Sequence, residues 1–183
     1  MTAPELAYLF EDTQWGTVQA RFERCDSPPP DAQINNANIV PFVRGASGEN
    51  QWIAVRLADG MLEVPGGTRE AGETLIETVR RELMEEAGCE LLTYRVFGAW
   101  HCLSASLAPY RPHLAHPAFY RVAGWGEVRR VGVPTNPADG EVVVAAEAGP
   151  IEAIAARFAA CGRPDLADLY RLANGLMMEA GDA

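Results

Sequence analysis

The most informative stretch of this sequence is GTREAGETLIETVRRELMEEAGC, residues 67–89. Its apolar residues recur at intervals of three and four, which is the spacing of one face of an α-helix, so we expect a helix from Glu73 to Ala87. Gly88 follows where a helix that ends in the left-handed conformation favours a residue without a Cβ. The buried stripe of this helix is predicted to contain Leu75, Ile76, Val79, Leu83 and Ala87.

Three glutamates lie near the end of this predicted helix. Glu82, Glu85 and Glu86 stand at positions i, i+3 and i+4, so their carboxylates share one face. Like charges at this spacing repel, and the helix dipole also disfavours anions in the last turn. One interpretation is a solvated face, with Arg81 paired to Glu77 and Glu85. The other is a site for Mg²⁺ or Mn²⁺, because hard cations prefer clustered carboxylate oxygens.

The same stretch resembles the Nudix box, G-x5-E-x7-R-E-U-x-E-E-x-G-U, in which U is an aliphatic residue. The matching residues are Gly67, Glu73, Arg81, Glu82, Leu83, Glu85, Glu86 and Gly88. Two small departures are Cys89 at the final U position and Thr78 where many members have alanine. A buried cysteine behaves as a small hydrophobic residue. The resemblance favours the metal site over the solvated face.

The resemblance implies an α/β fold of the α/β/α sandwich type, in which a mixed β-sheet lies between helices. It also implies a hydrolase that depends on Mg²⁺, with Mn²⁺ as a substitute, and that uses water to cut a phosphoanhydride bond. The implied metal ligands are Glu82, Glu85, Glu86 and the carbonyl group of Gly67. The implied catalytic residues are Glu85, Arg81, which would orient Glu85, and Glu73, which would support the loop and the start of the helix.

The base that accepts the proton of the attacking water varies in this family between the helix and a later loop or strand. Glu141 is the favoured candidate downstream, because it follows the turn residues 137–140 and opens an apolar run, at a junction of loop and strand. A solvated turn residue would explain its position equally well. The other downstream candidates are Glu127 and Glu147.

The stretch 100–120 contains all three histidines and is a candidate substrate loop. Tyr110, Arg111 and His113 would bind substrate there, since a guanidinium group binds phosphate and rings stack on a base or sugar. A surface loop without a ligand is the alternative. A zinc site is also conceivable from the ligand types, although their spacing matches no familiar pattern: His101, Cys102, His113 and His116.

The rest of the chain is consistent with a single domain over residues 1–183. Residues 1–33, which end in a proline-rich segment, are interpreted as an N-terminal extension, and residues 150–179 as C-terminal packing helices that start at Pro150 and Pro164. Alternation and β-branched residues predict strands at 38–43, 51–57, 61–64, 91–100, 119–133 and 141–145.

The charge and the cysteines narrow the functional classes further. The formal net charge of −10, without a local cluster of basic residues, argues against nucleic-acid binding. A small phosphorylated substrate remains compatible with an acidic site that binds a cation. The four scattered cysteines indicate reduced thiols. No signal peptide or membrane span is readable, so we expect a cytoplasmic protein that does not bind membranes.

The leading functional hypothesis is hydrolysis of a nucleoside diphosphate linked to another moiety, such as a nucleotide sugar. One alternative is a nucleoside triphosphate pyrophosphohydrolase that removes noncanonical nucleotides. Another is a Nudix-like module that senses a nucleotide without turnover. The alanine-rich segment Ile151–Cys161 could serve a homodimer contact.

Overall fold

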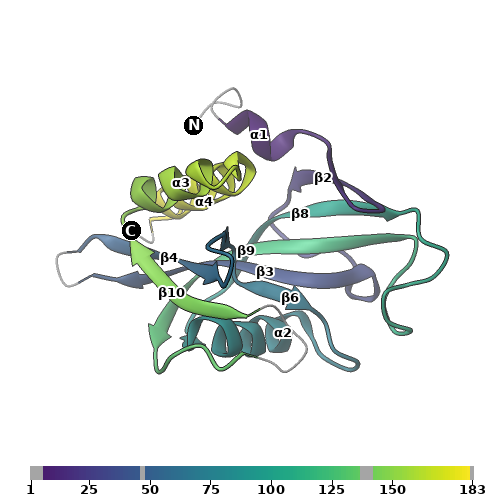
Figure 1. The fold of residues 1–183 in the computed structure, drawn as a ribbon, viewed down its shortest axis with the longest axis horizontal. Coiled ribbons are helices and arrows are strands. Elements are labelled where there is room, and N and C mark those ends of the chain that lie inside the picture. Colours follow the sequence, from purple (N-terminus) through teal and green to yellow (C-terminus); the bar gives the residue numbers. More distant parts are fainter. Residues whose placement is uncertain (1–5, 46–47, 137–141, 182–183) are drawn as a thin grey trace.

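The computed structural model describes residues 6–45, 48–136 and 142–181. Its centre is a mixed β-sheet, and Figure 1 shows helices α3 and α4 on one face and α2 on the other. The expected sandwich is therefore confirmed. In spatial order the main strands are β1 (Thr13–Trp15), β2 (Val18–Arg24), β8 (Arg95–Ser104), β9 (Ala118–Arg130), β3 (Ile34–Arg44), β4 (Asn50–Leu57) and β10 (Val143–Gly149).

Strands β3 and β9 form the parallel pair of this sheet, and their neighbours run antiparallel. Three short strands attach to the main ones: β5 (Leu62–Glu63) to β4, β6 (Gly66–Thr68) to β3, and β7 (Cys89–Leu91) to β9. The helices are α1 (Ala7–Phe10), α2 (Leu75–Glu82), α3 (Ile151–Ala160) and α4 (Pro164–Glu179). A 3₁₀ turn covers Asp31–Gln33.

The N-terminal region differs from the prediction. Residues 13–24 form β1 and β2, and β2 pairs with β8 along its whole length, so this part of the predicted extension belongs to the sheet. The sequence of β2 does alternate, because Ala20 and Phe22 are buried while Gln19 and Arg21 are exposed. This alternation is the ordinary signal of a strand with one buried face.

The predicted helix from Glu73 to Ala87 is present with two refinements. It begins at Leu75, and its last turn, Leu83–Ala87, is a π-helical turn. Gly88 ends it in the left-handed conformation with φ of 60°, as expected. The predicted strand at 91–100 is divided, because β7 ends at Leu91 and β8 starts at Arg95.

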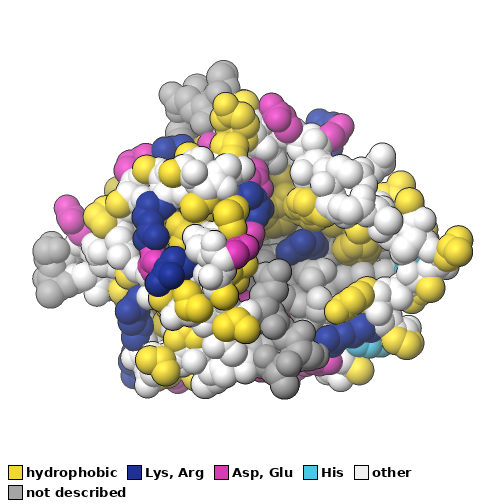
Figure 2. Space-filling view, viewed as in Figure 1, with side chains coloured by type: hydrophobic (Ala, Val, Ile, Leu, Met, Phe, Trp, Pro, Cys, Tyr) yellow, Lys and Arg dark blue, Asp and Glu magenta, His cyan; other side chains and the backbone are white. Residues whose placement is uncertain are grey.

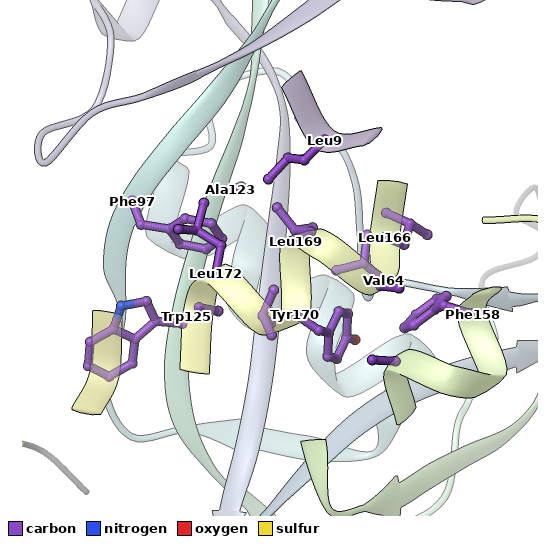
Figure 3. Packing of buried hydrophobic residues seen from close by; sticks show 14 of the residues in the cluster. Leu9, Val64, Phe97, Ala123, Trp125, Phe158, Leu166, Leu169, Tyr170 and Leu172 are labelled. Atoms are coloured by element: carbon purple, nitrogen blue, oxygen red, sulfur yellow. The ribbon is translucent and has the colours of Figure 1, made fainter. Parts of the chain in front are cut away.

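Two hydrophobic cores cover the two faces of the sheet. Leu75, Val79 and Leu83 pack α2 and its π-helical turn onto one face. On the other face, Figure 3 shows Leu169 and Leu172 of α4 packed among residues of α1 and of the strands. The hydroxyl group of Tyr170 on α4 also donates a hydrogen bond of 2.6 Å to the carbonyl oxygen of Ile53 on β4. Both layers are therefore held by buried side chains on every helix.

All four cysteines are free thiols.

No helix in the described part of the chain is long and apolar enough to cross a membrane.

Candidate active site

The start of α2 is held by a capping box. Thr74 accepts a hydrogen bond from the backbone N–H of Glu77, and the Glu77 carboxylate accepts one of 2.8 Å from the backbone N–H of Thr74. This reciprocal arrangement satisfies two backbone donors that the first turn leaves free. The Glu77 carboxylate is therefore bonded to Thr74 at the start of the helix and not to Arg81. Of the two ion pairs that the solvated-face interpretation predicted for Arg81, only the one with Glu85 is formed.

Arg81 lies at the centre of the acidic cluster. Its Nε donates to Oε1 of Glu73 over 2.7 Å and its Nη2 donates to the other oxygen over 3.1 Å. Its Nη1 donates to Glu82 over 2.8 Å and to Glu85 over 3.2 Å. Nη2 also donates to the carbonyl oxygen of Thr68 on β6, over 3.0 Å. One guanidinium group thus offsets the repulsion among three carboxylates and connects α2 to β6.

Glu73 is a fully engaged anion. Besides Arg81, its carboxylate accepts hydrogen bonds from the backbone N–H of Glu70 at 2.9 Å and from the hydroxyl group of Thr78 at 3.0 Å. The hydrogen bonds from Arg81 are the largest cause that lowers the pKa of Glu73 to about 2. The buried Thr78, a departure from the family pattern, therefore has a defined partner within the site.

Glu82 contrasts with Glu73 because it is buried. Burial raises the pKa of its carboxyl group, although Arg81 opposes the shift. A Cβ atom at Gly67 would lie 2.2 Å from Oε1 of Glu82, so only glycine fits against this carboxylate without a displacement. The backbone of Gly67 and the carboxylate of Glu82 therefore lie against each other, while their role as metal ligands stays a prediction.

Glu86 connects the helix to a cavity of about 610 Å³, which we call the acidic cavity. Its Oε2 accepts a hydrogen bond of 2.9 Å from the backbone N–H of Gly66. Figure 2 shows a hollow beside the α3–α4 layer with dark blue atoms on its floor. These atoms belong to arginine side chains, because the chain contains no lysine. The charged and polar residues that line the acidic cavity are Thr13, Asn38, Glu63, Glu86, Arg121, Arg163 and Asp165.

Most of these lining residues were not identified from the sequence. Glu63 is paired with Arg163, and burial is the largest cause that raises the pKa of its carboxyl group. Arg163 also bonds Asp165 at 2.9 Å. Within the described residues Arg121 forms no ion pair, although the Glu63 carboxylate attracts it from a greater distance. A possible signal was the position of Glu63 just before the loop Pro65–Gly67, but Arg121 and Arg163 lie far away in sequence.

The predicted substrate loop lies beside the box rather than in the acidic cavity. Arg111 forms an ion pair with Glu70, and Nε2 of His113 lies 2.9 Å from the carbonyl oxygen of Arg69. Tyr110 is 81% exposed and lines a separate cavity of about 430 Å³. Of the three predicted substrate residues, Tyr110 lines this cavity, and His113 lines a smaller one of about 130 Å³ beside Arg69 and Glu70.

The histidines do not form the zinc site that their types made conceivable. His101 stacks on Tyr120, with ring centroids 5.1 Å apart, whereas His116 approaches Ser106 in the loop. Within the described residues, no three His, Cys, Asp or Glu side chains are arranged to hold a metal ion. That statement includes the acidic face of α2, where Arg81 takes the place a cation would have between Glu82 and Glu85.

The downstream base candidates have different outcomes. Glu141 lies outside the described residues. Glu127 pairs with Arg44 at 3.1 Å, and Glu147 pairs with Arg56 at 2.7 Å and with Arg157. Neither of these two lines the acidic cavity, whereas Glu63 does. The carboxylates of Glu127 and Glu147 therefore form structural ion pairs away from the acidic cavity.

Comparison with known proteins now identifies the family. A family model described as the NUDIX domain matches residues 36–171, which is most of the chain. The chain belongs to the Nudix family. Family membership supports a pyrophosphohydrolase, and Nudix hydrolases generally use divalent metal ions.

Solved structures of Nudix proteins share this fold. A mutant of the Bacillus subtilis pyrophosphohydrolase BsRppH is similar with a TM-score of 0.52 and 16% identity, over 76% of this chain and 75% of that one. The Nudix hydrolase RenU of M. smegmatis is similar with a TM-score of 0.51 and 12% identity, over 80% and 88% of the two chains. No curated protein matches the sequence.

The predicted metal ligands of this Nudix chain are chemical groups of the type that binds a divalent cation. Three carboxylates and the backbone at Gly67 offer only oxygen ligands, which suit Mg²⁺ and Mn²⁺. The contact between Gly67 and Glu82 leaves no space for a side chain, so the backbone can approach an ion held by Glu82. Cation binding would require Glu82 and Glu85 to turn from Arg81, while the bonds from Arg81 to Glu73 can remain.

Proposed function

We propose that this Nudix protein hydrolyses a phosphoanhydride bond in a nucleoside diphosphate linked to another moiety, with Mg²⁺ as cofactor. One observation carries the proposal: the acidic face of α2 reaches, through Glu86, the same cavity that Arg121 and Arg163 line. Carboxylates that suit a cation and guanidinium groups that suit phosphate thus border one space. Its volume of about 610 Å³ lies within the usual range for small-molecule sites.

In this proposal Glu82, Glu85, Glu86 and the carbonyl group of Gly67 hold Mg²⁺, and Mn²⁺ can substitute. When bound, the cation neutralises phosphoryl oxygens and lowers the pKa of water. Arg81 remains bonded to Glu73 and keeps α2 against β6, so the helix that carries the ligands keeps its position while Glu82 and Glu85 turn toward the cation. The positioning role of Glu73 follows from its bonds to both the loop at Glu70 and the helix at Thr78.

The proton of the attacking water needs a carboxylate as acceptor. Glu85 and Glu141 are the candidates that the sequence indicates, and Glu63 is added because it lines the acidic cavity. Glu63 has a raised pKa, which makes it a better proton acceptor than an ordinary glutamate provided it stays ionised. Replacement of each by glutamine, followed by the pH dependence of kcat, identifies the residue whose loss removes the acidic limb.

The expected partners are small nucleotides, and we also propose a homodimer. In α3, Ile154, Ala155 and Phe158 are buried within the chain's own core, so a dimer contact would use the opposite face of the helix. Gel filtration with light scattering tests this proposal, and a monomer at micromolar concentration would contradict it. The expected cytoplasmic location likewise stays a proposal, which cell fractionation can test.

The function is tested with a panel of nucleotide sugars, ADP-ribose, dinucleoside polyphosphates and nucleoside triphosphates, with Mg²⁺ or a chelator. Metal-dependent formation of two phosphate monoesters from a diphosphate-linked compound supports the proposal. Release of pyrophosphate from a triphosphate would establish the house-cleaning alternative instead. Binding of a nucleotide without turnover would indicate the sensor.

The matched variants for this assay are Glu86→Gln and Glu90→Gln. Both remove one carboxylate charge, but Glu90 is exposed on β7 and pairs with Arg129, away from the acidic cavity. We expect Glu86→Gln to lower kcat by about 10²- to 10⁴-fold, since the charge that holds the cation is lost. Glu90→Gln should stay within about twofold of the parent. Equal turnover of the two variants would refute the metal role of Glu86.

A further inference from the structure

A second cavity lies next to the acidic cavity and has a different chemical character. We call this space of about 430 Å³ the neutral cavity, because, apart from Arg121 at the side shared with the acidic cavity, no Arg, Asp or Glu among the described residues lines it. It shares Trp15 and Arg121 with the acidic cavity. Its other lining residues include Asn36, Tyr110, His116 and Phe119, which combine rings with neutral hydrogen-bonding groups. Such a lining suits an uncharged ring rather than a cation or a phosphate chain.

Arg121 lies close to the Nudix box through the sheet, although it is far from the box in sequence. In β9 it is in register with Asn36 of β3, and Asn36 is in register with Thr68 of β6. Side chains in register on neighbouring strands share a face of the sheet. Asn36 donates to the hydroxyl group of Thr68 over 3.1 Å, and the carbonyl oxygen of Thr68 accepts from Arg81. Strands β3 and β6 thus connect Arg121 on β9 to the helix α2, which carries the proposed metal ligands.

The guanidinium group of Arg121 forms no ion pair within the described residues, although the carboxylate of Glu63 attracts it from a greater distance. Its Nε is buried and makes no hydrogen bond, and the ring of Trp15 lies 4.8 Å from its central carbon. Burial is the largest cause that lowers the pKa of Arg121, and the nearby Glu63 carboxylate offsets it only in part. The other arginine of the acidic cavity, Arg163, pairs with both Glu63 and Asp165. A partly buried cation that forms no ion pair is costly, and a bound anion would offset this cost.

A second unpartnered atom lines the acidic cavity on the same side of the sheet. Asn38 is 2% exposed, and its Oδ1 is buried without a hydrogen bond. Asn38 lies two residues along β3 from Asn36, the register partner of Arg121. A free donor site and a free acceptor site thus border one cavity, and a ligand with a phosphate and hydroxyl groups would satisfy both.

We propose that Arg121 binds the phosphate of the nucleoside monophosphate half of the substrate, and that Trp15 and the neutral cavity hold its sugar and base. This assignment rests on the proposed function. It orients the substrate, because the phosphate on Arg121 faces Glu86 across the acidic cavity while the base extends to Tyr110 and Phe119. A nucleoside monophosphate, being that half alone, should bind without metal and compete with the substrate.

The test measures binding by isothermal titration calorimetry, with EDTA present and without turnover. The probes are AMP, GMP, CMP and UMP and the four corresponding nucleosides. Arg121→Met is compared with Arg80→Met, because Arg80 is exposed on α2 and lines neither cavity. For the monophosphate that binds best, Arg121→Met should raise Kd about 10- to 100-fold, as expected for a lost charge-assisted hydrogen bond. Its nucleoside should change less than twofold, and Arg80→Met should change neither.

Two further measurements separate ligand binding from a structural role. The Tm of Arg121→Met should equal or exceed that of the parent, because an unpaired buried charge is removed. Arg121→Lys keeps the charge without the planar fork, so it should recover part of the lost affinity. Trp15→Leu should weaken the monophosphate and its nucleoside by a similar factor, since both lose the stacking surface.

These binding measurements do not depend on whether the protein hydrolyses its substrate. Absence of binding of every monophosphate by the parent would overturn the assignment, and so would equal monophosphate affinity in Arg121→Met. A lower Tm of Arg121→Met with no recovery in Arg121→Lys would show a structural arginine instead. If the substrate panel shows no turnover while Arg121→Met loses monophosphate affinity, the proposed hydrolysis fails and the nucleotide site stands.

Discussion

Two arginines of this protein, Arg81 and Arg121, have opposite surroundings. Arg81 donates hydrogen bonds to three carboxylates and to a backbone carbonyl, so the fold itself uses all of its charge. Arg121 contacts the ring of Trp15, and its buried Nε has no partner. The two side chains lie on either side of β6 and its neighbour β3.

The difference shows how an arginine can be assigned to structure or to ligand binding. A guanidinium group surrounded by carboxylates holds those carboxylates in place, and its removal leaves them repelling one another. A guanidinium group without an anion costs the folded state free energy, and this cost persists at functional sites because a ligand offsets it. Arg81 is of the first kind, and we infer that Arg121 is of the second.

The largest expected effect is that of Arg81→Met. Glu73 and the buried Glu82 would lose their cation, so the free energy of unfolding should fall by about 3–5 kcal/mol. Urea denaturation measures this change, with Arg80→Met on the exposed side of the same helix as control. A fall below about 1 kcal/mol would remove the contrast with Arg121, whose replacement is expected not to destabilise the protein.

The pH dependence of stability isolates one carboxylate around Arg81. The pKa of Glu73 is lowered to about 2 in the folded protein, mainly by the hydrogen bonds from Arg81. A lowered pKa stabilises the fold above the unfolded value of 4.5 and loses this effect as the pH falls toward 2. Because solvent screens this partly exposed carboxylate, the lost contribution should be about 1–2 kcal/mol.

Urea denaturation between pH 6 and the acid limit of the folded state checks this prediction, with Glu73→Gln beside the parent. The variant should be less stable than the parent at neutral pH, and the difference should shrink steadily below about pH 4.5, the ordinary glutamate pKa. A difference that does not change with pH would show that Arg81 leaves the pKa of Glu73 unperturbed.

Thr78→Val tests a smaller part of the same cluster. Valine keeps the volume and branching of threonine but removes the hydroxyl group that donates to Glu73. The expected loss is about 1 kcal/mol, the usual contribution of a side-chain hydrogen bond. Thr17→Val is a suitable comparison, since Thr17 is exposed in the turn between β1 and β2. Identical melting of Thr78→Val and the parent would exclude a role of the hydroxyl group in holding Glu73.

The helix of the box and the chain around Arg121 also differ in how far the sequence predicted them. The helix, its end at Gly88 and its acidic face follow from spacings of one to four residues, and all three are present. The divided strand after Leu91 was not predicted, since β7 depends on its pairing with β9. The π-helical turn was not predicted either, and Thr135 and Asn136, distant in sequence, donate backbone hydrogen bonds to the carbonyl oxygen of Glu85 within it. Strands β1 and β2 were missed because their three and seven residues stand beside proline-rich sequence.

The sequence by itself determined the family and the helix that carries the acidic face, because both depend on the spacing of near neighbours along the chain. The tertiary structure decided which side chains border the site. Trp15 from the N-terminal strands, Arg121 from β9 and Arg163 before α4 meet only after the sheet has assembled. It also decided that Arg81 is paired and Arg121 is not, since the partners of a charge depend on distances in space that the order of residues does not contain.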